Sequence, residues 1–127
     1  MLFPGFYWVR AVSRRGPRHK YAAEEVLMRI LTDEKLFKVC EIVFSADRLI
    51  HASDVARETG ISVGYSYILL KKLEKWGVVK GVRDPLNGRL AFKPGATKAS
   101  MLVSDEIRRR KVKEIEGEIS RHIALEL

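Results

Sequence analysis

The sequence predicts an α+β fold in which several helices are followed by one β-hairpin and a long final helix. Apolar residues recur at helical spacing from about Tyr21 to Trp76, and after Gly77 the pattern changes to the alternation of strands. A strong turn signal at residues 84–88 separates two alternating segments. Apolar side chains then recur every four residues from about 99 to 123, which predicts one more helix.

Two helices are expected before residue 46. The first begins near Tyr21, and Thr32 and Asp33 are good N-cap residues for a second helix that runs to about Ser45. A single longer helix with a kink is the alternative. The apolar stripes of the two segments contain Val26, Leu27, Ile30 and Leu31, and then Leu36, Val39, Cys40, Val43 and Phe44.

The next two helices are short and closely joined. Ser53 can cap the first of them and Gly60 can end it. Ser62 can cap the second, which runs to about Trp76 and is stopped by Gly77. Its inward residues are expected to be Leu69, Leu70 and Leu73.

Strands are expected at residues 78–83 and 89–93, joined by a tight Asn87-Gly88 turn with Arg89 at or next to its tip. The final helix contains Gly117, which costs roughly 1 kcal/mol relative to alanine. A bend there, or the close approach of another backbone, would explain this glycine.

Composition and charge limit the classes of function and partner that are expected. The net charge is +8 and the sequence pI is about 9.8, which favours nucleic acid as a partner first and an anionic membrane surface second. The single cysteine excludes an intramolecular disulfide, and we find neither a secretory signal nor an apolar run of the roughly 20 residues that a membrane helix needs. We therefore expect a cytoplasmic protein without a membrane partner.

Three segments resemble a known family. Residues 54–62 (DVARETGIS) resemble the first helix and turn of winged helix-turn-helix domains, and residues 69–79 (LLKKLEKWGVV) look like the end of a recognition helix that enters the wing. Residues 83–89 (RDPLNGR) are similar to the wing of MarR-type regulators, although Asn87-Gly88-Arg89 lacks the acidic member of their usual Asp-x-Arg motif. The resemblance implies a three-helix core with a β-hairpin wing, here with an extra N-terminal helix and a long C-terminal helix.

That fold divides the chain into an apolar and basic arm (1–20), a winged-helix domain (21–98) and a C-terminal dimerisation helix (99–127). In MarR-like regulators such outer helices build the dimer, so the resemblance implies a homodimer. The residues expected at the dimer interface are Val103, Ile107, Val112, Ile115, Ile119 and Ile123.

An α-helix fits the major groove of DNA, and a basic wing can reach phosphates or the minor groove beside it. The expected DNA-binding residues are Ser62, Val63, Gly64, Tyr65, Tyr67, Ile68, Lys71 and Lys72 on the helix, Arg83, Asn87 and Arg89 on the wing, and Arg14, Arg15 and Arg18 in the arm. For the wing, a solvated hairpin is the alternative, and for the arm a solvated, disordered segment. Partial burial in the core is the alternative for Tyr65.

Enzymatic functions find no support. His19, His51 and His122 share no metal-ligand spacing with one another or with Cys40, and no phosphate-binding glycine loop or nucleophile elbow occurs. Cys40 lies on an apolar stripe, so a buried thiol is expected, with a redox-sensing role as the alternative. We expect no enzymatic activity and no cofactor.

The sequence thus predicts sequence-specific binding of double-stranded DNA by a homodimeric transcriptional regulator. The apolar character of several recognition-helix positions leaves a second function open, because such a face binds thymine methyl groups or a protein equally well. The alternative is a winged-helix adaptor in a transcription, replication or membrane-remodelling assembly. A small-molecule effector is neither indicated nor excluded.

Overall fold

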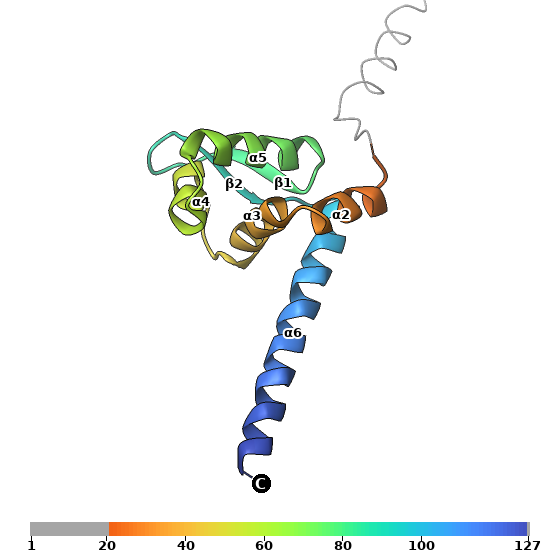
Figure 1. Cartoon of the computed structure of the whole chain (residues 1–127). Coiled ribbons are helices and arrows are strands. Elements are labelled where there is room, and N and C mark those ends of the chain that lie inside the picture. The colour runs from red at the N-terminus through yellow and green to blue at the C-terminus, as the bar shows by residue number, and fades with distance from the viewer. Residues whose placement is uncertain (1–20, 127) are drawn as a thin grey trace, which may run out of the picture.

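Figure 1 shows the computed structural model of the chain, which describes residues 21–126. Its elements, in chain order, are α2 (Ala23–Leu31), α3 (Glu34–Ser45), α4 (Ala52–Thr59), α5 (Val63–Lys75), β1 (Val79–Arg83), β2 (Leu90–Pro94) and α6 (Lys98–Glu126). Helices α3, α4 and α5 and the hairpin lie together, α2 packs beside the start of α6, and the rest of α6 extends away from them. The predicted α+β winged-helix architecture is confirmed.

Helices α2 and α3 are separate, so the alternative of one kinked helix is wrong. Oδ1 of Asp33 accepts hydrogen bonds from the backbone N–H groups of Lys35 (3.1 Å) and Leu36 (3.2 Å). A side chain that satisfies these amides starts a new helix, because the first N–H groups of any helix have no partner within it. Asp33 therefore sets the boundary that the sequence indicated.

The turn between α4 and α5 is built largely as predicted. Gly60 ends α4 in the left-handed conformation (φ +82°), where glycine is favoured, and Oγ of Ser62 caps α5 by accepting from the N–H of Tyr65 at 3.1 Å. The predicted cap of α4 at Ser53 is wrong. His51 occupies the N-cap position, and its backbone N–H donates to Oδ2 of Asp54 at 2.8 Å.

Strands β1 and β2 pair antiparallel, with Val79 opposite Pro94 and Arg83 opposite Leu90. An isolated β-bridge joins β2 to the segment before α4: Ile50 and Phe92 exchange two backbone hydrogen bonds of 2.9 and 2.8 Å. Both side chains are buried. The base of the hairpin is therefore fixed to the helix-turn-helix unit.

The hairpin loop differs from the predicted two-residue Asn87-Gly88 turn. The N–H of Gly88 donates to the carbonyl of Asp84 (2.7 Å), and the N–H of Asp84 to the carbonyl of Arg89 (2.8 Å), so residues 85–88 form a four-residue loop. Pro85 has the fixed φ that suits the second position of a type I turn, and Gly88 supplies the positive φ (+71°) that closes the loop. Leu86, at 93% exposure, is at the tip, and Arg89 lies at the base of the loop.

The core contains apolar residues from every helix and from both strands. Among the largest fully buried side chains are Ile30, Leu36, Ile50, Leu70, Leu73 and Phe92. The first turns of α6 complete this core against α2 and α3, with Val103 and Ile107 only 0% and 5% exposed. The prediction that these two residues lie at a dimer interface is therefore wrong, because the domain needs them to cover its own apolar faces. None of the helices from residue 21 to 126 is long and apolar enough to cross a membrane.

Candidate nucleic-acid interface

Helix α5 has one buried and one exposed face. Leu69, Leu70 and Leu73 are buried, as predicted, and Ser66 is buried with its hydroxyl donating to the carbonyl of Ser62 at 2.8 Å. On the other face, Val63, Tyr67 and Ile68 are 52%, 43% and 60% exposed. The helix is thus anchored along its inner side and presents apolar and phenolic groups outward.

Two other predicted positions on α5 are also open to solvent. Tyr65 is 41% exposed, so the alternative of partial burial in the core is wrong. The ammonium group of Lys35 lies 5.5 Å from the centre of its ring, at cation–π distance. Gly64 has no atom within 4 Å of where a Cβ would be, so the helix surface here is open to a partner.

The lysines of α5 are exposed but engaged with neighbours. Nζ of Lys71 pairs with Oε1 of Glu74 at 2.7 Å, and this hydrogen bond raises the pKa of Lys71. Oε2 of Glu74 accepts from the N–H of Gly81 at 3.1 Å, so Glu74 joins α5 to β1. Nζ of Lys72 lies 5.5 Å from the ring centre of Trp76. Both lysines are therefore exposed, each beside a partner within the domain.

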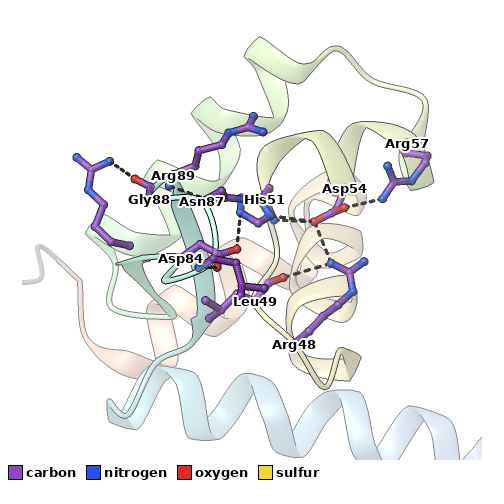
Figure 2. Close-up of polar contacts among 11 residues, drawn as sticks. Arg48, Leu49, His51, Asp54, Arg57, Asp84, Asn87, Gly88 and Arg89 are labelled. Carbon is purple, nitrogen blue, oxygen red and sulfur yellow. Dashed lines mark hydrogen bonds and ion pairs between the residues drawn. The ribbon is translucent and has the colours of Figure 1, made fainter.

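Two of the three predicted wing residues make hydrogen bonds within the wing. Nη1 of Arg83 donates to the carbonyl of Gly88 at 3.1 Å, and Oδ1 of Asn87 accepts from the backbone N–H of Arg89 at 2.9 Å. Arg83 and Asn87 therefore stabilise the loop. The guanidinium of Arg89 is exposed and points away from the polar contacts in Figure 2, so it is available to an external partner.

An open cleft of about 1010 Å³ runs between α5 and the junction of α2 and α3. Its basic lining residues are Arg29, Lys35, Lys71, Lys72 and Lys75. Arg29, Lys35 and Lys75 were not among the predicted site residues. Arg29 and Lys35 meet α5 only through the packing of separate helices, which no local pattern marks, whereas Lys75 lies in the last turn of α5 itself.

A polar cluster connects α4 with the wing (Figure 2). Asp54, a buried carboxylate, pairs with Arg48 (3.2 Å) and Arg57 (2.5 Å). Burial by itself raises the pKa of Asp54, but hydrogen bonds from the His51 backbone and from the two arginines outweigh it and lower the pKa from 3.8 to about 2. Across the gap to the wing, Nε2 of His51 lies 3.1 Å from Oδ2 of Asp84. Sequence reasoning missed this cluster: Arg48, Asp54 and Arg57 are close in the sequence but were not considered together, and the contact with Asp84 joins a distant segment.

The remaining predictions concern the arm, the thiol and metals. Arg14, Arg15 and Arg18 lie outside the described residues. Cys40 is buried as expected, and desolvation raises the pKa of its thiol to about 12, which disfavours the reactive thiolate. Between residues 21 and 126, no group of three or more His, Cys, Asp or Glu side chains could hold a metal ion.

Comparison with known proteins identifies the fold. Neither a protein-family model nor a curated protein sequence matches this chain. Among solved structures, FabT of Streptococcus pneumoniae in complex with DNA superposes with a TM-score of 0.60 at 21% identity, over 98% of this chain and 81% of FabT.

Two further structures are similar at lower identity. The adhesin competence repressor AdcR of Streptococcus pyogenes gives a TM-score of 0.55 at 12% identity, over 95% of this chain and 78% of AdcR. Apo MarR of E. coli gives 0.54 at 15% identity, over 91% of this chain and 82% of MarR. The resemblance seen in the sequence is thereby confirmed at the level of architecture: this chain has the winged helix-turn-helix fold of MarR-type regulators.

Proposed function

We propose that this chain is a transcriptional regulator that binds double-stranded DNA sequence-specifically. The observation that carries the proposal is the outer face of α5, which is exposed while the inner face is buried and both ends are capped. A helix held in this way can enter the major groove as a rigid element, with its N-terminal residues at the base edges. Such a regulator would act in the cytoplasm.

The side chains of α5 suggest how the groove would be read. Val63 and Ile68 would contact thymine methyl groups, and the hydroxyl of Tyr67 would reach a base or a phosphate. Lys72, near the C-terminal end of the helix, would bind phosphate. The hydroxyl of Ser62 is already used as the helix cap, so its contribution to binding would be to orient α5.

The wing would add phosphate or minor-groove contacts beside α5. Figure 1 places the hairpin loop at the same end of the molecule as α4 and the start of α5. Arg89 would make the contact with DNA, while Arg83 and Asn87 hold the loop. FabT, which superposes on this chain, was crystallised in complex with DNA, and this supports DNA as the partner. Contacts from Arg14, Arg15 and Arg18 to the minor groove stay a prediction.

Dimerisation through the outer half of α6 is the second part of the proposal. Val112, Ile115, Ile119 and Ile123 are 49–56% exposed and follow one another at three- and four-residue intervals along the helix. An apolar stripe of this kind on a helix that extends beyond its domain is typical of an oligomer interface. A second copy of the chain would cover it, and a two-fold dimer would place two α5 helices on two half-sites.

The proposal is tested by fluorescence anisotropy with genomic fragments and nonspecific competitor DNA. A dimer that contacts roughly 6–10 phosphates should lose about 10³–10⁵ in affinity between about 50 and 200 mM salt. Arg89→Ala should weaken binding to all sequences alike and lower the salt slope by about one. The matched control is Arg108→Ala, which removes the same charge from an exposed position on α6. Absence of binding at low salt would refute the proposal.

A second function has a specific observation in its favour. The exposed face of α5 carries Val63, Ile68 and two tyrosines beside its lysines, and such apolar and aromatic groups also suit a protein partner. Tyr67→Ala separates the two functions. If DNA is the partner, specific affinity should fall by about 1–3 kcal/mol and nonspecific affinity should change less. If the chain is an adaptor, DNA binding should be unchanged and a protein partner should be lost.

A further inference from the structure

His51 lies between two buried carboxylates that belong to different parts of the domain. Its Nδ1 is 3.5 Å from Oδ2 of Asp54 in α4, and its Nε2 is 3.1 Å from Oδ2 of Asp84 at the start of the wing loop. The contact with Asp84 falls outside hydrogen-bond geometry, and Nε2 is buried without another partner in the described chain. The side chain of His51 is only 17% exposed. The imidazole is therefore the link between α4 and the wing loop.

The two carboxylates differ in their other partners. Asp54 is neutralised by Arg48 and Arg57 and accepts the backbone N–H of His51. Asp84, 7% exposed, accepts from the N–H of Leu86 at 2.9 Å, but among residues 21–126 the structure gives it no arginine or lysine partner. These are the charged groups that face the imidazole from the preceding loop, from α4 and from the wing. His51 is thus the group whose charge can compensate Asp84.

The protonation state of the imidazole decides whether both contacts are favourable. A neutral imidazole with its hydrogen on Nε2 still points that N–H at Asp84, while its Nδ1 faces the backbone N–H of Asp54 in the capping box of α4, but it carries no positive charge to compensate the carboxylate. An imidazolium carries an N–H on each nitrogen and a positive charge. A buried carboxylate without a compensating charge is unfavourable, so the wing loop should be held to α4 more firmly when His51 is protonated.

We infer that His51 is a positioning residue that fixes the wing loop on the N-terminus of α4 in its protonated form and loosens it when the proton is lost. This inference rests on the proposed function insofar as the wing contacts DNA. The neighbouring Ile50–Phe92 bridge keeps the base of the hairpin in place in both states. The change should therefore be confined to the loop, residues 84–89, which carries Arg89.

The first experiment uses the free protein and does not depend on DNA. NMR spectra recorded from about pH 5.5 to about pH 8.5, the range in which histidines change charge, follow the His51 ring and the backbone amides of Leu86 and Gly88. The two amides should titrate with the midpoint of the ring. In Asp84→Asn this shared midpoint should disappear, because the asparagine amide removes the negative charge from Nε2 while its oxygen can still accept from Leu86. Asp105→Asn, the same change at an exposed carboxylate on α6, should titrate as wild type does.

The second experiment measures DNA affinity over the same pH range. Wild type and Asp105→Asn should bind about threefold to tenfold more tightly near pH 6 than near pH 8, the size of one charge-assisted contact. His51→Gln and Asp84→Asn should lose that difference. The inference would be overturned if the amides of Leu86 and Gly88 did not titrate with the midpoint of the His51 ring, or if these amides titrated in Asp84→Asn as they do in wild type. If DNA binds at no pH, the proposed function fails, while the spectra of the free protein still decide the role of His51.

Discussion

The two halves of α6 have the same kind of apolar pattern and opposite environments. In the first half, Ala99, Val103 and Ile107 follow each other every four residues and are 5%, 0% and 5% exposed. In the second half, Ile115 and Ile119 continue the same spacing and are 56% and 53% exposed. A spacing of four residues therefore predicts that a helix has an apolar face, but it does not say which surface covers that face.

The boundary between the halves is made by polar contacts with α3. The guanidinium of Arg110 lies 4.3 Å from the ring centre of Phe37 and also donates to Glu106 at 2.9 Å. At the next residue, Nζ of Lys111 donates a hydrogen bond to Oγ of Ser45 at 3.0 Å. From Lys111 to Leu125 every residue except Gly117 is exposed, and the outer part of α6 extends away from the domain (Figure 1). The first half belongs to the folding core of this chain, and the second is available to a partner.

The largest effect is expected from a charge placed in the first half. Val103→Asp should remove at least about 4 kcal/mol of unfolding free energy, because an unpaired carboxylate would be buried in the core. Urea denaturation followed by circular dichroism measures it, with Ile119→Asp as the matched control in the outer half. The control should change monomer stability by less than about 1 kcal/mol. Equal losses in the two variants would show that the halves are not different.

The next largest effect is expected on association through the outer half of α6. Ile115→Glu combined with Ile119→Glu should convert dimers to monomers at micromolar concentration, since two unpaired charges would face the partner helix. We expect the dissociation constant to rise at least about 100-fold, equivalent to roughly 3 kcal/mol. Sedimentation velocity measures it. Met101→Glu, at an exposed position in the first half, should remain dimeric. A wild-type protein that is already monomeric would exclude this interface.

Several features that a short segment determines, such as helix caps and helix ends, were predicted correctly from the sequence. Asp33, Gly60 and Ser62 were recognised because each acts on backbone groups within a few residues of itself. Local patterns also had failures. The loop of the wing was misassigned because Pro85 favours a different turn from the one that Asn87-Gly88 suggested, and His51 was overlooked as the cap of α4.

Only part of the candidate site could be predicted from local sequence patterns. The exposed positions of α5 follow from its period, and Val63, Tyr67 and Ile68 were placed correctly on its outer face. The buried partners of Val103 and the contact between His51 and Asp84 depend on packing between distant segments, which no spacing in one sequence reveals. The contacts of Arg83 and Asn87 are local, but they depend on the conformation of the wing loop, which the sequence analysis assigned wrongly.

A smaller effect is expected at the boundary, from Glu106. The hydrogen bond from Arg110, helped by Arg109, outweighs burial and lowers the pKa of this carboxyl below its usual 4.5. A lowered pKa means that the stabilisation is present above about pH 4.5 and is lost as the pH falls through the folded-state pKa. Glu106→Gln should cost about 1 kcal/mol near neutral pH and flatten the acid limb of the stability curve, the arginines being largely exposed. Urea midpoints between about pH 3 and 7 measure this, and Asp105→Asn should leave the curve unchanged.

The smallest effect tests whether the outer half of α6 is a helix by its own propensity alone. A Cβ on Gly117 would meet only the end of the Arg121 side chain, at 3.8 Å, so Gly117→Ala should stabilise the helix locally by up to about 1 kcal/mol. Gly117→Ala should be introduced into the double variant Ile115→Glu, Ile119→Glu, in which no partner helix covers the apolar face of the outer half of α6. Amide hydrogen exchange should then slow up to about fivefold within residues 112–123, because local opening of this segment becomes rarer, while the global urea midpoint stays the same.

Gly64→Ala is the matched control, since its Cβ would also meet open space but α5 is part of the core. There the same substitution should raise the global midpoint instead. If Gly117→Ala also raised the global urea midpoint, the outer half of α6 would unfold together with the domain. The two halves would then differ in how exposed their apolar side chains are, but not in when they unfold.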